Sequence, residues 1–216
     1  MDFQQVMDTC AANVSIQTMS AIVSQESNFN PYAIGVNGDY TLEKQPTTKK
    51  EALEVVEWLA KQDITNIDLG LGQISKGNRK AYGITPEEAF DPCRNVQVSG
   101  AILTDNYRRA LNSGLDEQDA LKVAISEYNT GSTTAGFSNG YVQKIINKVQ
   151  IATIFVPDLI KEGALISAQP KELKGEEQLV RSEYKENVYL SDSHSPKIYP
   201  TNDHGVDPNI FVYNGR

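Results

Sequence analysis

One carboxylate in this sequence stands where the pattern around it predicts an apolar side chain. Met19, Ile22 and Val23 follow helical spacing on one buried stripe, and Glu26 occupies the next position of that stripe. The helix is expected to end soon afterwards, because Pro31 disfavours its continuation. A glutamate at the open end of a buried stripe would lie in the wall of a cleft. Burial there would raise the pKa of its carboxyl group and suit it to donate a proton near neutral pH.

A lone glutamate at a helix end is more often a solvated surface residue than a catalytic one, so other segments must support the assignment. Three other short segments carry groups that could bind a ligand. These segments are residues 70–74, 127–131 and 140–142. Each is expected where a helix begins or ends, and such sites converge on clefts. Gly70 and Gly72 allow positive φ or a close approach of the backbone. They do not form a dinucleotide-binding fingerprint, because no third glycine follows at the required spacing.

The elements that would position these groups are mainly helices with recognisable caps. Expected helix N-caps are Asn13 or Ser15, Thr47 or Thr48, Asp91 and Asp116, and Thr85 is expected to cap a short turn. Helices are expected over residues 3–12, 46–62, 92–111 and 140–155. A further helix is expected from Asn13 or Ser15 to Glu26, and another from residue 116 to an end within residues 126–131. Asn37–Gly38 between apolar and aromatic flanks predicts a β-hairpin, which would form a small flap beside the cleft.

The composition changes after Pro157. Residues 163–185 are rich in Lys and Glu with few apolar anchors, and residues 191–216 are interrupted by prolines. Such a segment cannot bury enough apolar surface to offset the entropy of ordering. We therefore expect an ordered domain over residues 1–156 and a tail over residues 157–216 that is largely disordered or binds a partner.

The bulk composition excludes several function classes. The net charge of −8 argues against nucleic-acid binding and against recruitment to anionic membrane surfaces. No stretch approaches the roughly 18–20 continuous apolar residues of a membrane span. Only two histidines are present, His194 and His204, and Cys10 and Cys93 lack metal-ligand spacing. No metal site is expected.

The two cysteines and the N-terminus bear on the cellular compartment. Cys10 and Cys93 are either two buried thiols or one disulfide that joins the N-terminal helix to a later one. The disulfide would indicate the periplasm. Residues 1–4 have neither the basic start nor the apolar core of a signal peptide. The protein is then either cytosolic or a mature form whose leader has been removed, and we expect the periplasmic form.

Four segments in order and spacing resemble the motifs of lytic transglycosylases with the soluble-lytic-transglycosylase, lysozyme-like fold. They are Glu26-Ser27 with residues 29–31, and the segments 70–74, 127–131 and 140–142. The resemblance extends over most of residues 10–150. Residues 30–37 and 90–93 resemble the peptidoglycan-cleaving subunit of type IV secretion systems. The resemblance implies a mainly α, α+β lysozyme-like fold, in which a helical lobe and a small β-hairpin flap border a saccharide cleft.

The resemblance also implies a chemistry with one catalytic acid and no cofactor. Glu26 would protonate the glycosidic oxygen between N-acetylmuramic acid and N-acetylglucosamine in peptidoglycan. It would then take the proton of the muramic acid 6-hydroxyl, which attacks its own anomeric carbon and leaves a 1,6-anhydro end. Glycosidases usually need two carboxylates. By the resemblance, the 2-acetamido group of the substrate would replace the second one.

The neighbouring motif residues acquire substrate-binding roles by the same resemblance. Ser27 would shape the cleft beside the acid, and Gln73 would offer its amide to an N-acetyl group. Tyr128 and Asn129 would bind the saccharide, and Tyr141 would orient the catalytic carboxyl. Each also has a structural alternative: a helix-end hydroxyl, a loop-bracing amide, a helix-ending pair and a core aromatic. Phe29 is interpreted as a core residue.

One departure from the family and two competing functions remain open. The family commonly has Ala where this chain has Glu127. If that carboxylate points inward it could raise the pKa of Glu26, and Asp39 and Asp68 are other candidate second acids. A second acid would favour lysozyme-like hydrolysis. Alternatively, the chain could be a non-catalytic docking module that binds peptidoglycan and recruits secretion components through residues 157–216.

Overall fold

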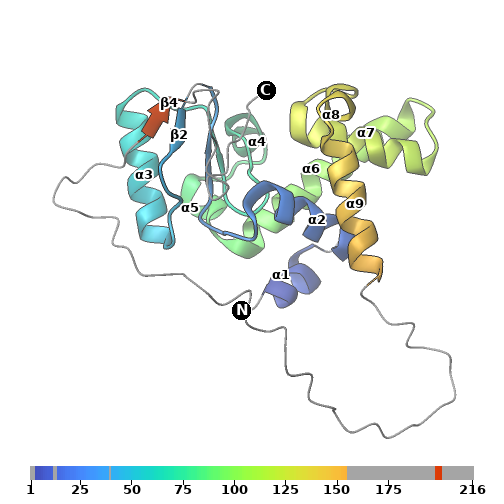
Figure 1. Ribbon diagram of the computed structural model, residues 1–216, viewed down its shortest axis with the longest axis horizontal. Helices are drawn as coiled ribbons and strands as arrows, with labels where there is room; N and C mark the ends of the chain where they lie inside the picture. Colours follow the sequence, from blue (N-terminus) through green and yellow to red (C-terminus); the bar gives the residue numbers. More distant parts are fainter. Residues whose placement is uncertain (1–2, 12–13, 39, 155–197, 201–216) are drawn as a thin grey trace, which may run out of the picture.

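The computed structural model describes residues 3–11, 14–38, 40–154 and 198–200, and within these the fold is mainly helical (Figure 1). The helices are α1 (Phe3–Cys10), α2 (Ile16–Ser27), α3 (Lys49–Lys61), α4 (Lys76–Ala81), α5 (Pro86–Ala89), α6 (Pro92–Asn112), α7 (Glu117–Thr130), α8 (Ala135–Ser138) and α9 (Tyr141–Ile154). The strands are β1 (Ile34–Val36), β2 (Tyr40–Leu42), β3 (Ile67–Leu69) and β4 (Ile198–Pro200). The predicted mainly α fold with a small β component is confirmed.

The helices begin where local chemistry places their caps. Thr48 and Thr85 each form a capping box with the glutamate three residues later. Asp91 and Asp116 accept backbone N–H groups at the starts of α6 and α7. Ser15 occupies the N-cap position of α2 without a side-chain capping bond.

The longest helix, α6, is the centre of the packing. It packs against α7, α1 and α5, while α2 packs against α9 (Figure 1). The apolar stripe of α2, formed by Met19, Ile22 and Val23, is fully buried as predicted. This packing brings the end of α2 beside the start of α9, although more than a hundred residues separate them in the chain.

The hairpin predicted around Asn37–Gly38 is wrong in its strand partners. Strands form on both sides of these residues, but β1 pairs antiparallel with β3 and β2 pairs antiparallel with β4. Every residue of β1 and β3 is buried, so their pairing is stabilised by the core. Asn37 extends that pair, because its backbone N–H donates to Asn66 O at 3.0 Å. Tertiary burial therefore outweighs the local turn signal.

The predicted tail falls mostly outside the described residues. Within it, the structure describes only residues 198–200, which form β4 and run antiparallel to β2, with Thr41 opposite Tyr199. The domain boundary near residue 156 stays a prediction. None of the helices in the described part of the chain has the length and apolar character needed to cross a bilayer.

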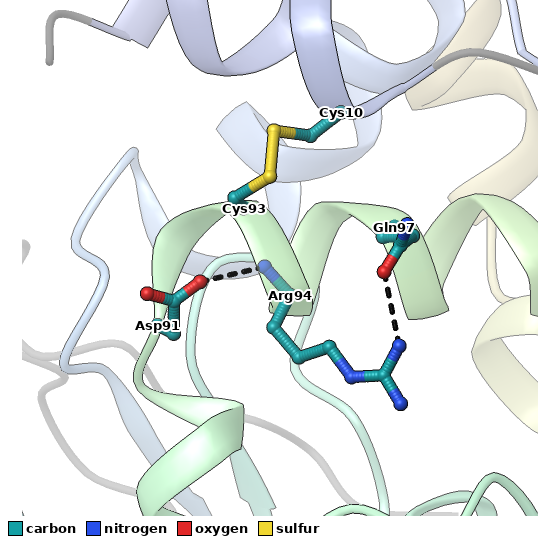
Figure 2. Close-up of a disulfide and its surroundings, with 5 residues drawn as sticks. All are labelled: Cys10, Asp91, Cys93, Arg94 and Gln97. Carbon is teal, nitrogen blue, oxygen red and sulfur yellow. Dashed lines mark hydrogen bonds between the residues drawn. A yellow bond between two sulfur atoms is a disulfide. The ribbon is translucent and has the colours of Figure 1, made fainter.

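Cys10 of α1 and Cys93 of α6 form a disulfide, with their Cα atoms 5.3 Å apart (Figure 2). This decides between the two alternatives that the sequence leaves open. The bond closes a span of 83 residues and anchors α1 to the first turn of α6. The same turn is capped by Asp91, whose Oδ1 accepts the backbone N–H of Arg94 at 2.8 Å (Figure 2).

Candidate active site

Glu26 lies in the last turn of α2 and is buried, with 5% of its surface exposed. The hydroxyl group of Tyr141, at the first position of α9, donates a hydrogen bond to Glu26 Oε1. Tyr141 is buried as well. The carboxylate therefore does not point into open water. It is directed at a phenol supplied by the neighbouring helix.

The chain turns sharply just after Glu26. Asn28 and Phe29 both have left-handed backbone conformations, with φ of 48° and 64°. Such a conformation costs an L-residue about 1–2 kcal/mol, so the surrounding contacts must enforce it. Asn30 supplies two of these contacts: its Nδ2 donates to Pro46 O at 3.1 Å and its Oδ1 accepts from Tyr32 N at 2.9 Å.

Two predictions about this turn have different outcomes. Phe29 is 42% exposed, so its interpretation as a core residue is wrong. The left-handed turn takes its side chain out of the apolar stripe of α2. Ser27 is buried and its hydroxyl donates to Val23 O at 3.1 Å, which is the helix-end contact that the sequence allows. Its part in shaping the cleft stays a prediction.

Gln73 closes a tight turn at residues 70–73, between β3 and α4. Leu69 and Ile74 pair across the turn, and Gly70 and Gln73 have positive φ of 76° and 49°. The Gln73 Nε2 donates to Ala33 O at 3.1 Å and to Gly70 O at 2.9 Å. The amide nitrogen thus braces the turn against the segment before β1. Any contact of Gln73 with an N-acetyl group stays a prediction.

Asn95 of α6 holds this turn from the opposite side, and sequence reasoning missed it. Its side chain is fully buried, and Nδ2 donates to Leu69 O at 2.9 Å and to Ala89 O at 2.7 Å. Its Oδ1 accepts the backbone N–H of Gly72 at 2.8 Å. One signal could have found it: Asn95 and Ser99 are polar residues on the buried stripe of α6, as Glu26 is on that of α2.

Tyr128 completes the enclosure of the turn. Its hydroxyl donates to Gly72 O at 2.7 Å. A Cβ atom at Gly72 would collide with Ser99 Oγ and with this hydroxyl, so only glycine fits there. Tyr128 therefore braces the turn. Its predicted binding of a saccharide stays a prediction. Asn129, the next residue, accepts a hydrogen bond from Asn139 Nδ2 at 2.9 Å.

The described candidate second acids face cations and amides. The Glu127 carboxylate lies 3.2 Å from Arg109 Nη2, on the side of α7 that packs against α6. Asp68 accepts from Asn37 Nδ2 at 3.1 Å. Burial lowers the pKa of Arg79, and the nearby charge of Asp68 opposes that shift. Asp39 lies outside the described residues. In the described part of the chain no cluster of three or more His, Cys, Asp or Glu side chains is arranged to hold a metal ion.

Comparisons with known proteins place the chain in one family. A family model described as "Transglycosylase SLT domain" matches residues 6–151. The chain is 36% identical over 203 residues to the "Type IV secretion system protein virB1" of Brucella abortus, covering 90% of this chain and 84% of that protein. It is 41% identical over 157 residues to the protein of the same name from Brucella suis, covering 70% and 65%. "Protein virB1" of Agrobacterium fabrum is 36% identical over 151 residues, covering 69% and 60%. No solved structure matches the chain.

Proposed function

Because the chain belongs to the transglycosylase SLT domain family, which makes it a lytic transglycosylase, we propose that Glu26 is its single catalytic acid and base. The substrate is the β-1,4 bond between N-acetylmuramic acid and N-acetylglucosamine in peptidoglycan. One observation supports the assignment most strongly: a buried carboxylate at the end of α2 that accepts a hydrogen bond from Tyr141.

In the first step Glu26 donates its proton to the glycosidic oxygen. Burial disfavours the ionised carboxylate and so favours the protonated acid that this step requires. Once the proton has left, the Tyr141 hydroxyl stabilises the negative charge, because hydrogen bonds to ionised groups are stronger than those between neutral groups. The same pair of residues thus supports both protonation states of Glu26.

In the second step the ionised Glu26 takes the proton of the muramic acid 6-hydroxyl. By then the bond between the anomeric carbon and the leaving glucosamine has broken. The hydroxyl oxygen bonds to the anomeric carbon of its own sugar, and a 1,6-anhydro end results. Water is not consumed and Glu26 regains its proton. The 2-acetamido group of the substrate stabilises the anomeric centre in place of a second carboxylate. The pairing of Glu127 with Arg109 supports this, since it engages the carboxylate that departs from the family pattern.

Saccharide binding falls to the polar side chains of the remaining motifs. In this proposal Gln73 and Asn129 contact the sugars through their amides, Tyr128 borders the saccharide and Ser27 shapes the cleft. The bracing bonds of Gln73 and Tyr128 support such roles, because they fix where the two side chains lie relative to the turn at residues 70–73.

The relatives suggest where the enzyme acts. Proteins named as type IV secretion components are similar in sequence to this chain over 90% of its length. We place the enzyme in the periplasm, where it opens the cell wall locally for assembly of a secretion system. The disulfide supports an oxidising compartment. Residues 157–216 would bind other secretion components.

Digestion of purified peptidoglycan by the wild-type chain and by Glu26→Gln tests the proposal. Mass spectrometry of the released muropeptides should show anhydro ends with the wild type. Glu26→Gln should release at least about 10²-fold less product, as expected for loss of a general acid, without loss of folding stability. Glu57→Gln on the exposed face of α3 is the matched control and should retain full activity. An active Glu26→Gln chain would contradict the assignment, and full secretion by Glu26→Gln together with loss on tail deletion would favour a docking module.

A further inference from the structure

The short strand β4 lies along β2, far from it in the chain (Figure 1). The two strands pair antiparallel over three residues each, with Thr41 opposite Tyr199 and Tyr40 opposite Pro200. Within the described residues β4 is the only strand that pairs with β2, because β1 pairs with β3. The edge of β2 is therefore occupied by a segment of the predicted tail.

Pro200 decides which backbone groups of the two strands meet. In an antiparallel ladder, residue pairs that exchange two backbone hydrogen bonds alternate with pairs that exchange none. Pro200 has no N–H, so Tyr40 and Pro200 cannot be a hydrogen-bonded pair. Thr41 and Tyr199 are therefore the pair whose N–H and C=O groups bond to each other. By the same alternation, the N–H of Ile198 faces away from β2.

The prolines of this segment suit a strand that pairs along one side only. Pro200 offers no donor on the side away from β2, and Pro196 stands at a position of the same parity in the sequence. Within sheets, proline is confined to edge strands and to positions whose N–H is not needed by the ladder. A strand with such an outer edge can add to β2 but offers little to a further strand. The backbone pattern of the segment thus matches the edge of β2.

The pairing of β2 and β4 is short enough to open by itself. One hydrogen-bonded pair gives a modest net stabilisation, because each backbone hydrogen bond replaces bonds to water. Closing the chain between Ile154 and Ile198 costs entropy, which opposes the pairing. Release should therefore occur without unfolding of the domain. We propose that the edge of β2 is a docking site for an extended strand, which residues 198–200 of the same chain occupy and leave reversibly.

The docking site connects the domain to the tail. A partner protein that binds residues 198–200 as an extended strand needs the same backbone groups as β2, so the partner and β2 compete for the segment. Asn37 holds the chain before β2, because its Nδ2 donates to Asp68 Oδ2 and its backbone N–H donates to Asn66 O. Release of β4 should therefore free the edge of β2 and leave the pair of β1 and β3 in place.

Hydrogen exchange of the full chain, measured by NMR at each amide, tests the pairing. Tyr199→Pro removes the N–H that bonds to Thr41, and the Thr41 amide should then exchange about tenfold faster, as for the loss of hydrogen bonds that contribute a modest net stabilisation. Tyr199→Ala is the matched control, because it changes the side chain and keeps the N–H, and Thr41 should exchange near its wild-type rate. The amides of β1 and β3 should keep their rates in both variants, which shows that the domain remains folded.

An added peptide tests whether the edge of β2 accepts a strand. The probe is a peptide of residues 194–203, supplied to the full Tyr199→Pro chain at about 10 mM, in the range of the effective concentration of a tethered segment. It should restore the slow exchange of the Thr41 amide. N-methylation of Ile198 in the peptide should leave this effect in place, because that N–H faces away from β2. N-methylation of Tyr199 should abolish it.

Four results would overturn the proposal. Thr41 could exchange equally fast in the wild type and in Tyr199→Pro, or Tyr199→Ala could exchange as fast as Tyr199→Pro. The two methylated peptides could act alike. Protection of Thr41 could rise with protein concentration together with a dimer in sedimentation, which would mean that the strand comes from a second copy. Glu26→Gln should show the wild-type exchange rate at Thr41, so a failure of the catalytic assignment leaves this test unaffected.

Discussion

The turn at residues 70–73 and the bridge between Asn129 and Asn139 position their side chains by different means. Asn95 and the Tyr128 hydroxyl hold the turn, and both act on its backbone from buried positions. The bridge is a hydrogen bond between two amides at an exposed position. A buried polar group that loses its partner has no water to replace it, whereas an exposed one does. Substitutions that disturb the turn should therefore affect stability first, and those at the bridge should affect activity first.

The largest expected contrast is between Asn95→Ala and Asn139→Ala. The first leaves the buried groups of Leu69, Gly72 and Ala89 without their side-chain partner, and we expect the free energy of unfolding to fall by about 3–5 kcal/mol. The second removes one exposed bridge and the side-chain acceptor of the Tyr141 N–H, for a loss of about 1 kcal/mol. Urea unfolding of the two variants measures both values. Equal losses would remove the distinction between the two regions.

The disulfide also supports the turn at residues 70–73, through α6. Cys93 lies two residues before Asn95, so the bond anchors the helix turn that supports residues 70–73. Replacing both cysteines with serine should lower the free energy of unfolding by about 2–4 kcal/mol, as expected for a long closed loop. Thermal unfolding with and without reductant checks this. Reductant should lower Tm of the wild type but not of the double variant, and an insensitive wild type would contradict the prediction.

Two tyrosines allow the same chemical change at the turn and at Glu26. Tyr128→Phe removes the hydroxyl bound to Gly72 O and should lower the free energy of unfolding by about 1–2 kcal/mol. Tyr141→Phe removes the donor to Glu26 and should lower kcat by about 10- to 100-fold. We expect activity, and not stability, to be the main property that Tyr141→Phe changes. Parallel unfolding and activity assays decide, and a reversed pattern would show that the assigned roles are exchanged.

Local chemistry explains which parts of the fold the sequence could predict. Thr48, Thr85, Asp91 and Asp116 each satisfy backbone groups within the next few residues, so the helix starts are visible in short windows. Glu26 was visible for a similar reason, as a carboxylate on an apolar stripe. The strand partners were not, because β1 pairs across about thirty residues and the core decides the pairing.

The parts of the site that sequence reasoning missed depend on backbone conformation and distant contacts. The left-handed turn at Asn28 and Phe29 moves Phe29 to the surface, and no periodicity shows this. Asn95 bonds to backbone groups more than twenty residues earlier in the chain. The bracing bond of Gln73 was expected only as an alternative to substrate binding, and the bond of Tyr128 to Gly72 was not expected.

In the proposed mechanism one carboxylate cleaves the glycan without adding water. Digestion of peptidoglycan by the wild-type chain in water enriched in heavy oxygen, followed by mass spectrometry, tests it most directly. We expect muropeptides with 1,6-anhydro ends that carry no heavy oxygen. Reducing ends that have incorporated heavy oxygen would contradict it and would indicate hydrolysis assisted by a second group.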